Sequence, residues 1–354
     1  MKEQNSLDIK ILDVDIRLVS GDRKFFYYLS SLFKRYETVF EEEKAIISSF
    51  DWQDEFLKKN PLKLCKTADY SNIGPNIALS KKNNGIKFLK KIHGKRFKVD
   101  FKISGNKIQQ EFLCHRKLIK DFFDSLKGKK QYMDLFEISY YLFYYPFFWF
   151  LENFRDIHLL HASCVDTPKG GIVIAGLPGS GKSVTSLGLW NKRPENKLIS
   201  DNIVLYDREN IYTCPEPIRL HDEGKKLIDD KRLQRIDILN KNTCKGFYKI
   251  DEGRKDKCKP VIFLLAGLSD ETIMEEMNSE SAAGMVFNQS LQGAEILNYF
   301  EYASLLNFLK PEKNLFKDRM ESLSSLFKNV KCFSLTISRN NPIDSTVDKI
   351  MSLL

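Results

Sequence analysis

Hydrophobic and polar residues alternate over much of the first hundred positions, and this alternation predicts β-strands. Apolar side chains recur at every second residue over 9–11 and over 14–18, with a change of phase between the two runs that predicts a bulge. The alternation returns over 97–103, directly after the turn-forming pair His93-Gly94, and predicts a β-hairpin. The first part of the chain is therefore expected to be rich in strands.

The pattern becomes helical from about residue 107. Apolar residues at helical spacing predict an amphipathic helix; they are Phe112, Leu118, Ile119, Phe122, Phe123 and Leu126. The stretch 128–130 marks the best domain boundary. A second helix is predicted through the aromatic run 138–151. Because that run is shorter than the roughly 20 apolar residues that span a bilayer, and Pro146 interrupts it, we expect a helix buried against a sheet and no membrane span.

After residue 151, strand-like and helix-like segments alternate, which is typical of an α/β layer. The predicted strands are 172–175, 197–200, 203–206, 260–265 and 332–337, and the predicted helices are 183–190, 316–327 and 344–354. We therefore predict two domains. Residues 1–130 form a smaller β-rich α+β module, and residues 131–354 form an α/β domain in which helices flank a mixed or parallel sheet.

The composition fits a soluble globular protein and argues against a disulfide scaffold. Of the 354 residues, 42% are hydrophobic and 29% are charged, and the seven cysteines are scattered without a Cys-x-x-Cys pair. Neither a zinc site nor a disulfide framework is predicted, and reduced thiols in a cytoplasm are expected. The first twenty residues contain no continuous apolar stretch of the kind that a secretory signal needs.

The net charge of +9 has a local maximum between residues 81 and 98, which carry eight lysines and arginines and no acid. Such a segment can bind an acidic partner or nucleic acid. It can equally be a solvated hairpin edge that lysines protect from pairing, and this second interpretation is favoured. A nucleic-acid partner is therefore not expected.

An eight-residue motif at 176–183 carries the strongest chemical signal, because it matches G-x-x-x-x-G-K-[ST] between an apolar strand and a helix. Its glycines let the backbone approach phosphates, and the loop N–H groups and the helix N-terminus bind the anionic oxygens. Lys182 reaches the β- and γ-phosphates, and the Ser183 hydroxyl ligates Mg2+. The predicted nucleotide-binding residues are Gly176, Leu177, Pro178, Gly179, Ser180, Gly181, Lys182, Ser183 and Val184.

Asp201 is the best acidic residue to complete such a site. It ends the short strand Leu198-Ile199, one helix beyond the loop, and a βαβ arrangement places it at the carboxyl edge of the sheet. There it can assist Mg2+ or accept a proton from an attacking hydroxyl, but it can also simply cap a turn with Asn202. The later pair Asp270-Glu271 does not end its strand, so an ABC-type ATPase is disfavoured.

Two further residues are weaker candidates. His161 opens a strand that is expected to lie beside the loop strand, although a lone histidine is more often a core or surface residue. Arg219, in the segment 215–220, is the best-placed basic residue to reach a phosphate from a second loop, where it could stabilise a transferring phosphoryl group.

Three stretches together resemble the kinase core of the HPr serine kinase/phosphorylase family. They are 159–165 with His161, 170–183 with the phosphate-binding loop, and 198–204 with Asp201, and a fainter likeness covers about 135–354. The resemblance implies an HPr kinase-like P-loop fold that binds ATP. It also implies that Asp201 is the general base for a serine hydroxyl of a protein substrate and that His161 is its partner.

The sequence also departs from that family. Asn202 stands where members usually have a second acid, and Val184 replaces the acid that usually follows the loop serine. The arginine- and glycine-rich signature farther along the chain is missing. These departures indicate a divergent relative, of the sort associated with peptide or small-molecule modification.

We therefore expect a cytoplasmic ATP-dependent kinase that uses Mg2+, with Ser183 and Asp201 as metal ligands. It would transfer the γ-phosphate to a hydroxyl, serine above all, of a protein, peptide or small molecule that residues 1–130 help to recognise. The sequence does not decide between a monomer and a homo-oligomer. The alternatives are a regulatory P-loop ATPase without an acceptor, a small-molecule kinase of the shikimate-kinase type, and a nucleic-acid-binding ATPase.

Overall fold

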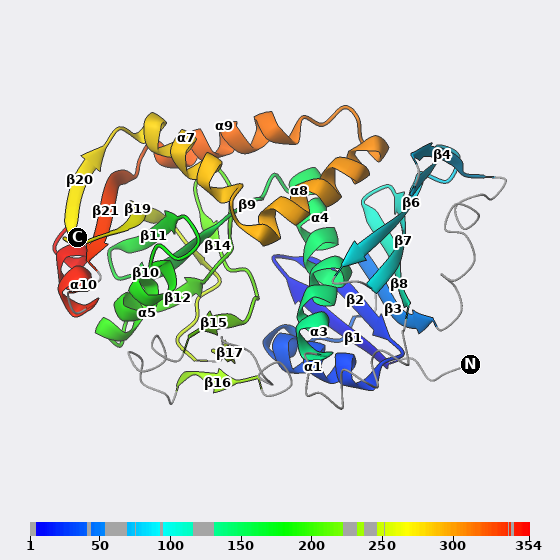
Figure 1. The fold of residues 1–354 in the computed structure, drawn as a ribbon, viewed down its shortest axis with the longest axis horizontal. Coiled ribbons are helices and arrows are strands. Elements are labelled where there is room, and N and C mark those ends of the chain that lie inside the picture. The colour runs from blue at the N-terminus through cyan, green and yellow to red at the C-terminus, as the bar shows by residue number, and fades with distance from the viewer. Residues whose placement is uncertain are drawn as a thin grey trace. The chain divides into compact units, whose positions relative to one another are not determined.

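The computed structural model describes residues 5–40, 44–53, 69–74, 76–92, 95–115, 131–221, 232–236, 246–250, 252–338, 340 and 343–354. The chain forms two compact units, each with its own sheets and helices (Figure 1). The first unit comprises residues 1–154, 237–243 and 302–313, and the second comprises 155–236, 244–301 and 314–354. The boundary predicted at 128–130 lies outside the described residues.

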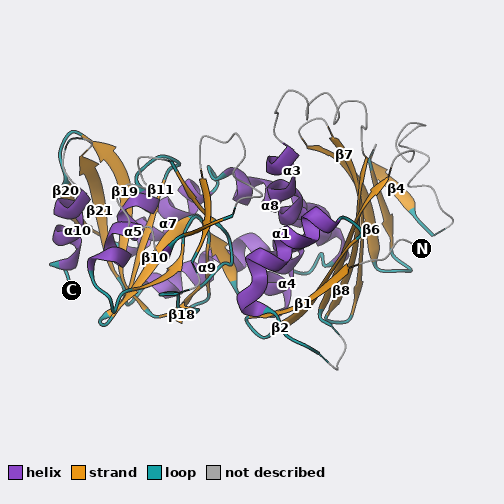
Figure 2. Cartoon of the chain, turned by 90° about the horizontal axis from the view of Figure 1, so that it is seen from below, coloured by secondary structure: helices purple, strands orange, loops and turns teal. Residues whose placement is uncertain are grey.

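The first unit contains an eight-stranded sheet in the order β1-β2-β3-β8-β7-β6-β5-β4. Its strands are β1 (Asn5–Ile11), β2 (Val14–Ser20), β3 (Ile46–Gln53), β4 (Ser71–Gly74), β5 (Ile77–Ser80), β6 (Gly85–Ile92), β7 (Lys95–Ser104) and β8 (Lys107–His115). Helices α1 (Arg23–Phe33) and α4 (Tyr145–Phe154) lie on one face of this sheet (Figure 2). This confirms that the first part of the chain is rich in strands.

The phase change after residue 11 is a hairpin turn and not the predicted bulge. β1 and β2 are antiparallel neighbours, with Ile11 opposite Val14. The two residues between them, Leu12 and Asp13, have φ angles of 50° and 57°. Positive φ at both central positions is the geometry of a tight two-residue hairpin, which reverses the chain and thereby resets the alternation.

The helix predicted from residue 107 is wrong in its described part. Residues 107–115 form strand β8, which lies between β3 and β7, and residues 116–130 are outside the described range. Phe112, one of the apolar residues behind the helix prediction, is fully buried in this strand. Its apolar character therefore reflects burial in the sheet and not the face of a helix.

The hairpin that includes 97–103 is confirmed, because β6 and β7 pair along their whole length; its turn at 93–94 lies outside the described residues. The expectation of a sheet edge is wrong, since β6 lies between β5 and β7. Lys87 of β6 forms an ion pair with Asp100 at 3.1 Å and lies over the ring of Tyr70. At least this lysine therefore has a structural role inside the sheet.

The aromatic run forms the predicted buried helix. It consists of α3 (Gln131–Ser139), a π-helical turn (Tyr140–Tyr144) and α4, in which Tyr145 to Asn153 are all buried. Proline lacks an N–H group, so Pro146 cannot bond back to residue 142, and the Tyr145 N–H instead bonds to the carbonyl of Tyr140. The helix therefore passes the proline by a π turn.

The second unit is built on a six-stranded mixed sheet in the order β12-β10-β11-β19-β21-β20. Its strands are β10 (Ala162–Thr167), β11 (Gly170–Gly176), β12 (Lys197–Ser200), β19 (Pro260–Ser269), β20 (Ile273–Met277) and β21 (Lys331–Ser338). The helices of this unit are α5 (Lys182–Lys192), α7 (Ser279–Ser290), α9 (Leu315–Phe327) and α10 (Ile343–Met351), and α8 (Ala294–Leu306) begins in it. The strands and helices predicted after residue 151 are all present, so the protein is a mixed α/β protein. The expectation that Asp270 does not end its strand is wrong, because β19 continues to Ser269 and Asp270 follows directly.

Two apolar cores lie on opposite faces of this sheet. α5 packs with α10 on one face, around Trp190 and Leu264, and α7 packs with α9 on the other, around Val286 and Phe263. Two smaller sheets complete the unit. One contains β9 (His158–Leu160), β13 (Val204–Tyr206), β14 (Ile211–Tyr212) and β18 (Lys257–Cys258), and the other contains β15 (Ile218–Leu220), β16 (Gln234–Arg235) and β17 (Gly246–Lys249).

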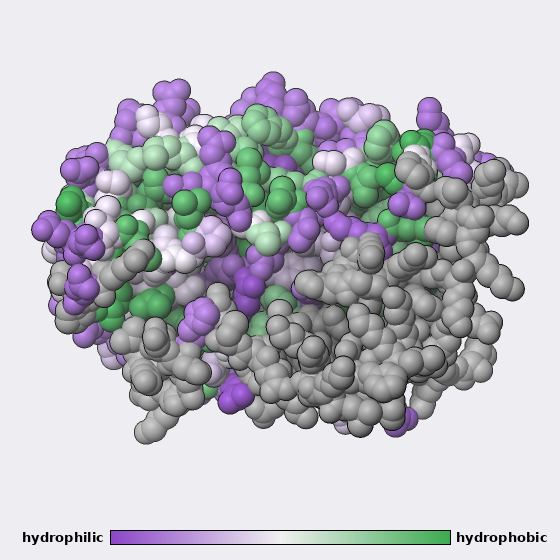
Figure 3. Space-filling model, viewed as in Figure 1, coloured by the Kyte–Doolittle hydropathy of each residue, from purple (hydrophilic) through white to green (hydrophobic). Residues whose placement is uncertain are grey.

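The surface mixes hydrophobic and hydrophilic residues on the face shown in Figure 3. The large exposed hydrophobic side chains include Leu177, Leu268 and Ile273 of the second unit. Within the described residues, no helix combines the length and the apolar character that crossing a bilayer requires.

Candidate functional site

Three predicted site residues lie at one edge of the six-stranded sheet. β11 ends at Gly176, and β12, which runs in the same direction because both strands are antiparallel to β10, ends directly before Asp201. β10 begins at Ala162, so His161 lies at the same edge. The sequence pattern predicted this edge for Asp201 but did not predict that β10 lies between the two strands. Their ends are therefore two strand spacings apart, about 10 Å.

The loop after β11 needs its glycines for steric reasons. Gly176 has a φ of 152°, and a Cβ there would lie 2.4 Å from the carbonyl oxygen of Ala266 on the neighbouring strand. Gly181 has a φ of 86° and immediately precedes α5. Side chains at these two positions would require strained backbone, and at Gly176 they would also overlap the next strand. The loop backbone therefore stays close to the sheet edge and leads directly into a helix N-terminus.

Lys182 is the first residue of α5 and is buried. Its Nζ donates hydrogen bonds to the carbonyl oxygens of Gly176 (2.9 Å) and Leu177 (3.0 Å), so the side chain folds back over its own loop. The Ser180 hydroxyl inside the loop is buried and has no hydrogen-bond partner among the described atoms. Ser183 and Val184, the next helical residues, are partly exposed. A bound anion could satisfy the Ser180 hydroxyl, which supports phosphate as the ligand.

Asp201 is almost completely buried and accepts a hydrogen bond from the Ser163 hydroxyl at 2.7 Å. Ser163 lies on β10 opposite Ile174 of β11, whose side chain belongs to the core on the α5 face. The contact therefore holds the Asp201 carboxylate on the face of the sheet that carries Lys182. The sequence analysis did not single out Ser163.

Asn202 has the left-handed backbone conformation, with a φ of 75°. Its side-chain amide donates a hydrogen bond to a carboxylate oxygen of Glu216 at 2.9 Å, and Glu216 is buried. Glu216 comes from the segment before β15, and no sequence pattern pointed to it. A buried carboxylate therefore lies next to the residue that follows Asp201 and fixes the turn there.

His161 packs against the turn between α7 and α8. Its backbone N–H donates to the Ser290 hydroxyl at 3.3 Å, and a Cβ on Gly293 would lie only 3.0 Å from its Nδ1. That Nδ1 atom is buried and has no hydrogen-bond partner among the described atoms. Burial, together with the charge of Lys182, lowers the pKa of His161 to about 4. The imidazole is therefore neutral at pH 7.

Arg219 lies on β15 and forms an ion pair with Glu295, the second residue of α8, with 2.6 Å between Nη1 and Oε1. Both side chains are mostly buried. Burial raises the pKa of Glu295, but the charge and hydrogen bond of Arg219 outweigh that effect and hold the pKa below its usual value. Arg219 also contributes to the lowered pKa of His161, and Glu295 opposes it, so the pair lies within electrostatic range of the imidazole. Glu295 had no signal in the sequence.

The predicted Mg2+ ligands are Ser183 and Asp201. In the part of the chain that the structure describes, no three histidines, cysteines, aspartates or glutamates gather where they could hold a metal ion. Mg2+ usually binds one or two protein oxygens and completes its shell with water and substrate phosphates. One hydroxyl at the loop and one carboxylate at the same sheet edge suit such an ion when a triphosphate is bound.

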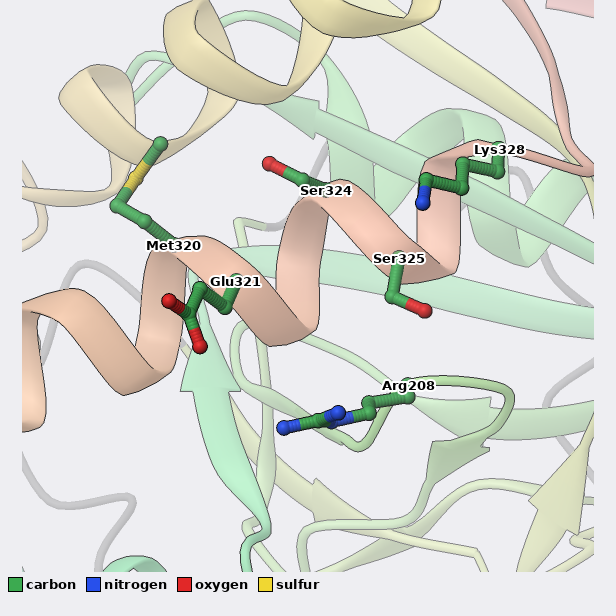
Figure 4. Close-up of a pocket in the computed structure, with 6 residues that line it drawn as sticks. All are labelled: Arg208, Met320, Glu321, Ser324, Ser325 and Lys328. Carbon is green, nitrogen blue, oxygen red and sulfur yellow. The ribbon is translucent and has the colours of Figure 1, made fainter.

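Two shallow cavities of the second unit lie elsewhere, and no predicted site residue lines either of them. One, of about 410 Å³, lies between α9 and Arg208, which belongs to the turn after β13 (Figure 4). The other, of about 520 Å³, is lined by the β10–β11 turn and several lysines. Since β10 begins and β11 ends at the loop edge, that turn lies at the opposite edge of the sheet from the glycine loop.

The chain was also compared with known proteins. No protein-family model matches it, and no curated protein matches it.

Proposed function

We propose that this chain is an ATP-dependent phosphotransferase with a P-loop kinase core that resembles HPr serine kinase. It transfers the γ-phosphate of ATP to a hydroxyl group, serine above all, of a protein, peptide or small molecule. The observation that supports this proposal is the meeting of three features at one sheet edge. They are a glycine loop that opens a helix at Lys182, the carboxylate of Asp201, and the imidazole of His161.

The loop binds the triphosphate through its backbone N–H groups and the N-terminus of α5. Lys182 leaves the two loop carbonyls that it contacts in this structure and binds the β- and γ-phosphates instead. The Ser180 hydroxyl gains an acceptor in the same step. Ser183 and Asp201 would hold Mg2+, which would neutralise charge on the phosphate oxygens.

Asp201 acts on the acceptor. Its carboxylate accepts the hydroxyl proton while the acceptor oxygen forms a bond to the γ-phosphorus, and the bond between that phosphorus and the bridging oxygen breaks to release ADP. The Ser163 hydroxyl orients the carboxylate through the 2.7 Å hydrogen bond. Arg219 stabilises charge on the transferring phosphoryl group. The neutral His161 lies at the same sheet edge. Residues 1–130 are proposed to recognise the acceptor.

The test combines γ-labelled ATP with candidate acceptors and an Asp201→Asn variant. We expect phosphotransfer to fall on the order of 10²-fold or more, because the proton acceptor is lost. The affinity for ATP, measured without Mg2+ so that the loss of a metal ligand does not enter, should change little. Asp270→Asn is the matched control, because Asp270 follows a strand of the same sheet but is exposed, and it should keep full activity. Unchanged turnover in Asp201→Asn would refute the assignment.

A regulatory nucleotide-binding protein without an acceptor is the second candidate function. The observation that favours it is that both residues after β12 already bind other residues of the protein. Asp201 accepts a hydrogen bond from Ser163, and Asn202 donates one to Glu216. Label that appears only in free phosphate, with every acceptor tested, would support this second function and would contradict the kinase.

A further inference from the structure

Glu295, the ion-pair partner of Arg219, lies beside the candidate site and has no role in the mechanism as described so far. Glu295 is the second residue of α8, and Gly293, two residues earlier, packs against the imidazole of His161. A Cβ at Gly293 would lie 3.0 Å from His161 Nδ1, so the turn before α8 packs closely against the imidazole. Glu295 therefore follows two residues after a backbone segment that lies next to His161.

Glu295 in turn places Arg219. The distance of 2.6 Å between Arg219 Nη1 and Glu295 Oε1 is that of a charge-assisted hydrogen bond. The strand that carries Arg219 is also fixed, because its neighbours Ile218 and Leu220 are buried and pair with β17. Backbone and guanidinium are thus both held, which removes most of the rotamer freedom of a long side chain.

The position of this pair matters electrostatically. Lys182 and Arg219 are two cations near one buried imidazole, and Glu295 is the carboxylate that acts against both. A guanidinium carries five N–H donors and can bind a carboxylate and a phosphate together. An arginine that is already oriented when the phosphoryl group transfers stabilises the developing charge without reorganisation.

We propose that Glu295 is a positioning residue for phosphotransfer, which holds Arg219 at the sheet edge beside His161 and Lys182. This inference rests on the proposed function. Glu295 does not contact the phosphates, and its effect passes through the guanidinium of Arg219. Its loss therefore lowers the turnover number and leaves the binding of ATP in the loop largely intact.

The experiment is a double-mutant cycle with Glu295→Gln and Arg219→Gln, measured as kcat and as KM for ATP. Glu295→Gln should lower kcat about tenfold in the parent background and by less than about twofold in the Arg219→Gln background. KM for ATP should change by less than about twofold. Glu295→Asp keeps the charge and should recover much of the lost kcat.

Glu280→Gln is the matched control. Glu280 is also a first-turn glutamate, on α7, but it is exposed, and its replacement should leave kcat unchanged. NMR titration of His161 tests separately that both charges of the ion pair lie beside the imidazole. Removing the anion of Glu295 should lower the pKa of the imidazole, and removing the cation of Arg219 should raise it.

The outcomes separate the two claims. The role of Glu295 alone would be overturned by either of two results in a parent protein with intact turnover. One is an equal kcat loss from Glu295→Gln in the parent and in the Arg219→Gln background, and the other is an unchanged His161 titration. Absence of phosphotransfer in the parent protein would overturn the proposed function and this role with it. Coupled kcat losses, rescue by Glu295→Asp and opposite shifts of the His161 pKa would establish the role.

Discussion

The buried imidazole of His161 gives the sharpest prediction for pH dependence. Burial and the charge of Lys182 lower its pKa from 6.5 to about 4 in the folded protein. An unfolded chain therefore binds the proton at a higher pH than the folded one does. The sign follows directly, because a depressed folded pKa means that stability is complete above pH 6.5 and is lost as the pH falls from 6.5 towards 4.

The magnitude can be worked from the same values. The full difference corresponds to a loss of about 3 kcal/mol in the free energy of unfolding, and the part lost between about pH 7.5 and about pH 5 is about 2 kcal/mol. A His161→Gln variant cannot titrate at this position. It should therefore lose about 2 kcal/mol less than the parent protein over the same pH interval.

The assay is urea unfolding of both proteins at the two pH values, with the imidazole titrated by NMR in the folded parent. A bound triphosphate adds negative charge near Lys182 and should raise the pKa of His161 back towards 6.5, which a repeat titration with ATP measures. Equal losses of stability in the parent and in His161→Gln, or an imidazole pKa near 6.5 without ligand, would refute the reasoning.

Three more predictions follow from single contacts. Gly176→Ala should destabilise the fold by about 2 kcal/mol or more in urea unfolding, since its Cβ would overlap a backbone oxygen. Gly267→Ala is the control and should change the midpoint of urea unfolding little, because no described atom lies within 4 Å of the added Cβ. Ser163→Ala removes the hydrogen bond to Asp201 and should cost about 1–3 kcal/mol by urea unfolding; wild-type stability would contradict the contact. Burial raises the pKa of the Cys214 thiol, so peptide mapping after alkylation should find it labelled only once the protein unfolds, and labelling of the native protein would show that the thiol is accessible.

Much of the fold could be predicted from local pattern. The five strands and three helices predicted after residue 151 are present, since an α/β layer repeats short, regular and strongly apolar segments. Other elements of this part of the chain, among them α7, α8 and β20, were not predicted. Local pattern failed for residues 107–115, where apolar residues spaced as in a helix form strand β8 in the middle of a sheet. It also misread the tight turn at Leu12 and Asp13 as a bulge.

The residues of the candidate site also fall into those that the sequence predicted and those that it did not. The residue pattern alone pointed to the glycine loop, Lys182 and Asp201, because each stands next to a predicted strand or helix. His161 gained weight only from the resemblance to a known family, and Arg219 was chosen as a basic residue on a second loop. What the sequence could not supply is the set of partners, since Ser163, Glu216 and Glu295 reach these residues from other elements.

By itself, the sequence therefore determined the glycine loop before α5 and the approximate position of several elements of the second unit, because both depend on neighbours within a few residues. Only the tertiary structure decided that β10 separates the loop strand from the strand of Asp201, and that Glu295 binds Arg219 next to His161. The physical reason is that strand order and side-chain contacts between distant segments are set by the packing of whole faces, which no local spacing encodes.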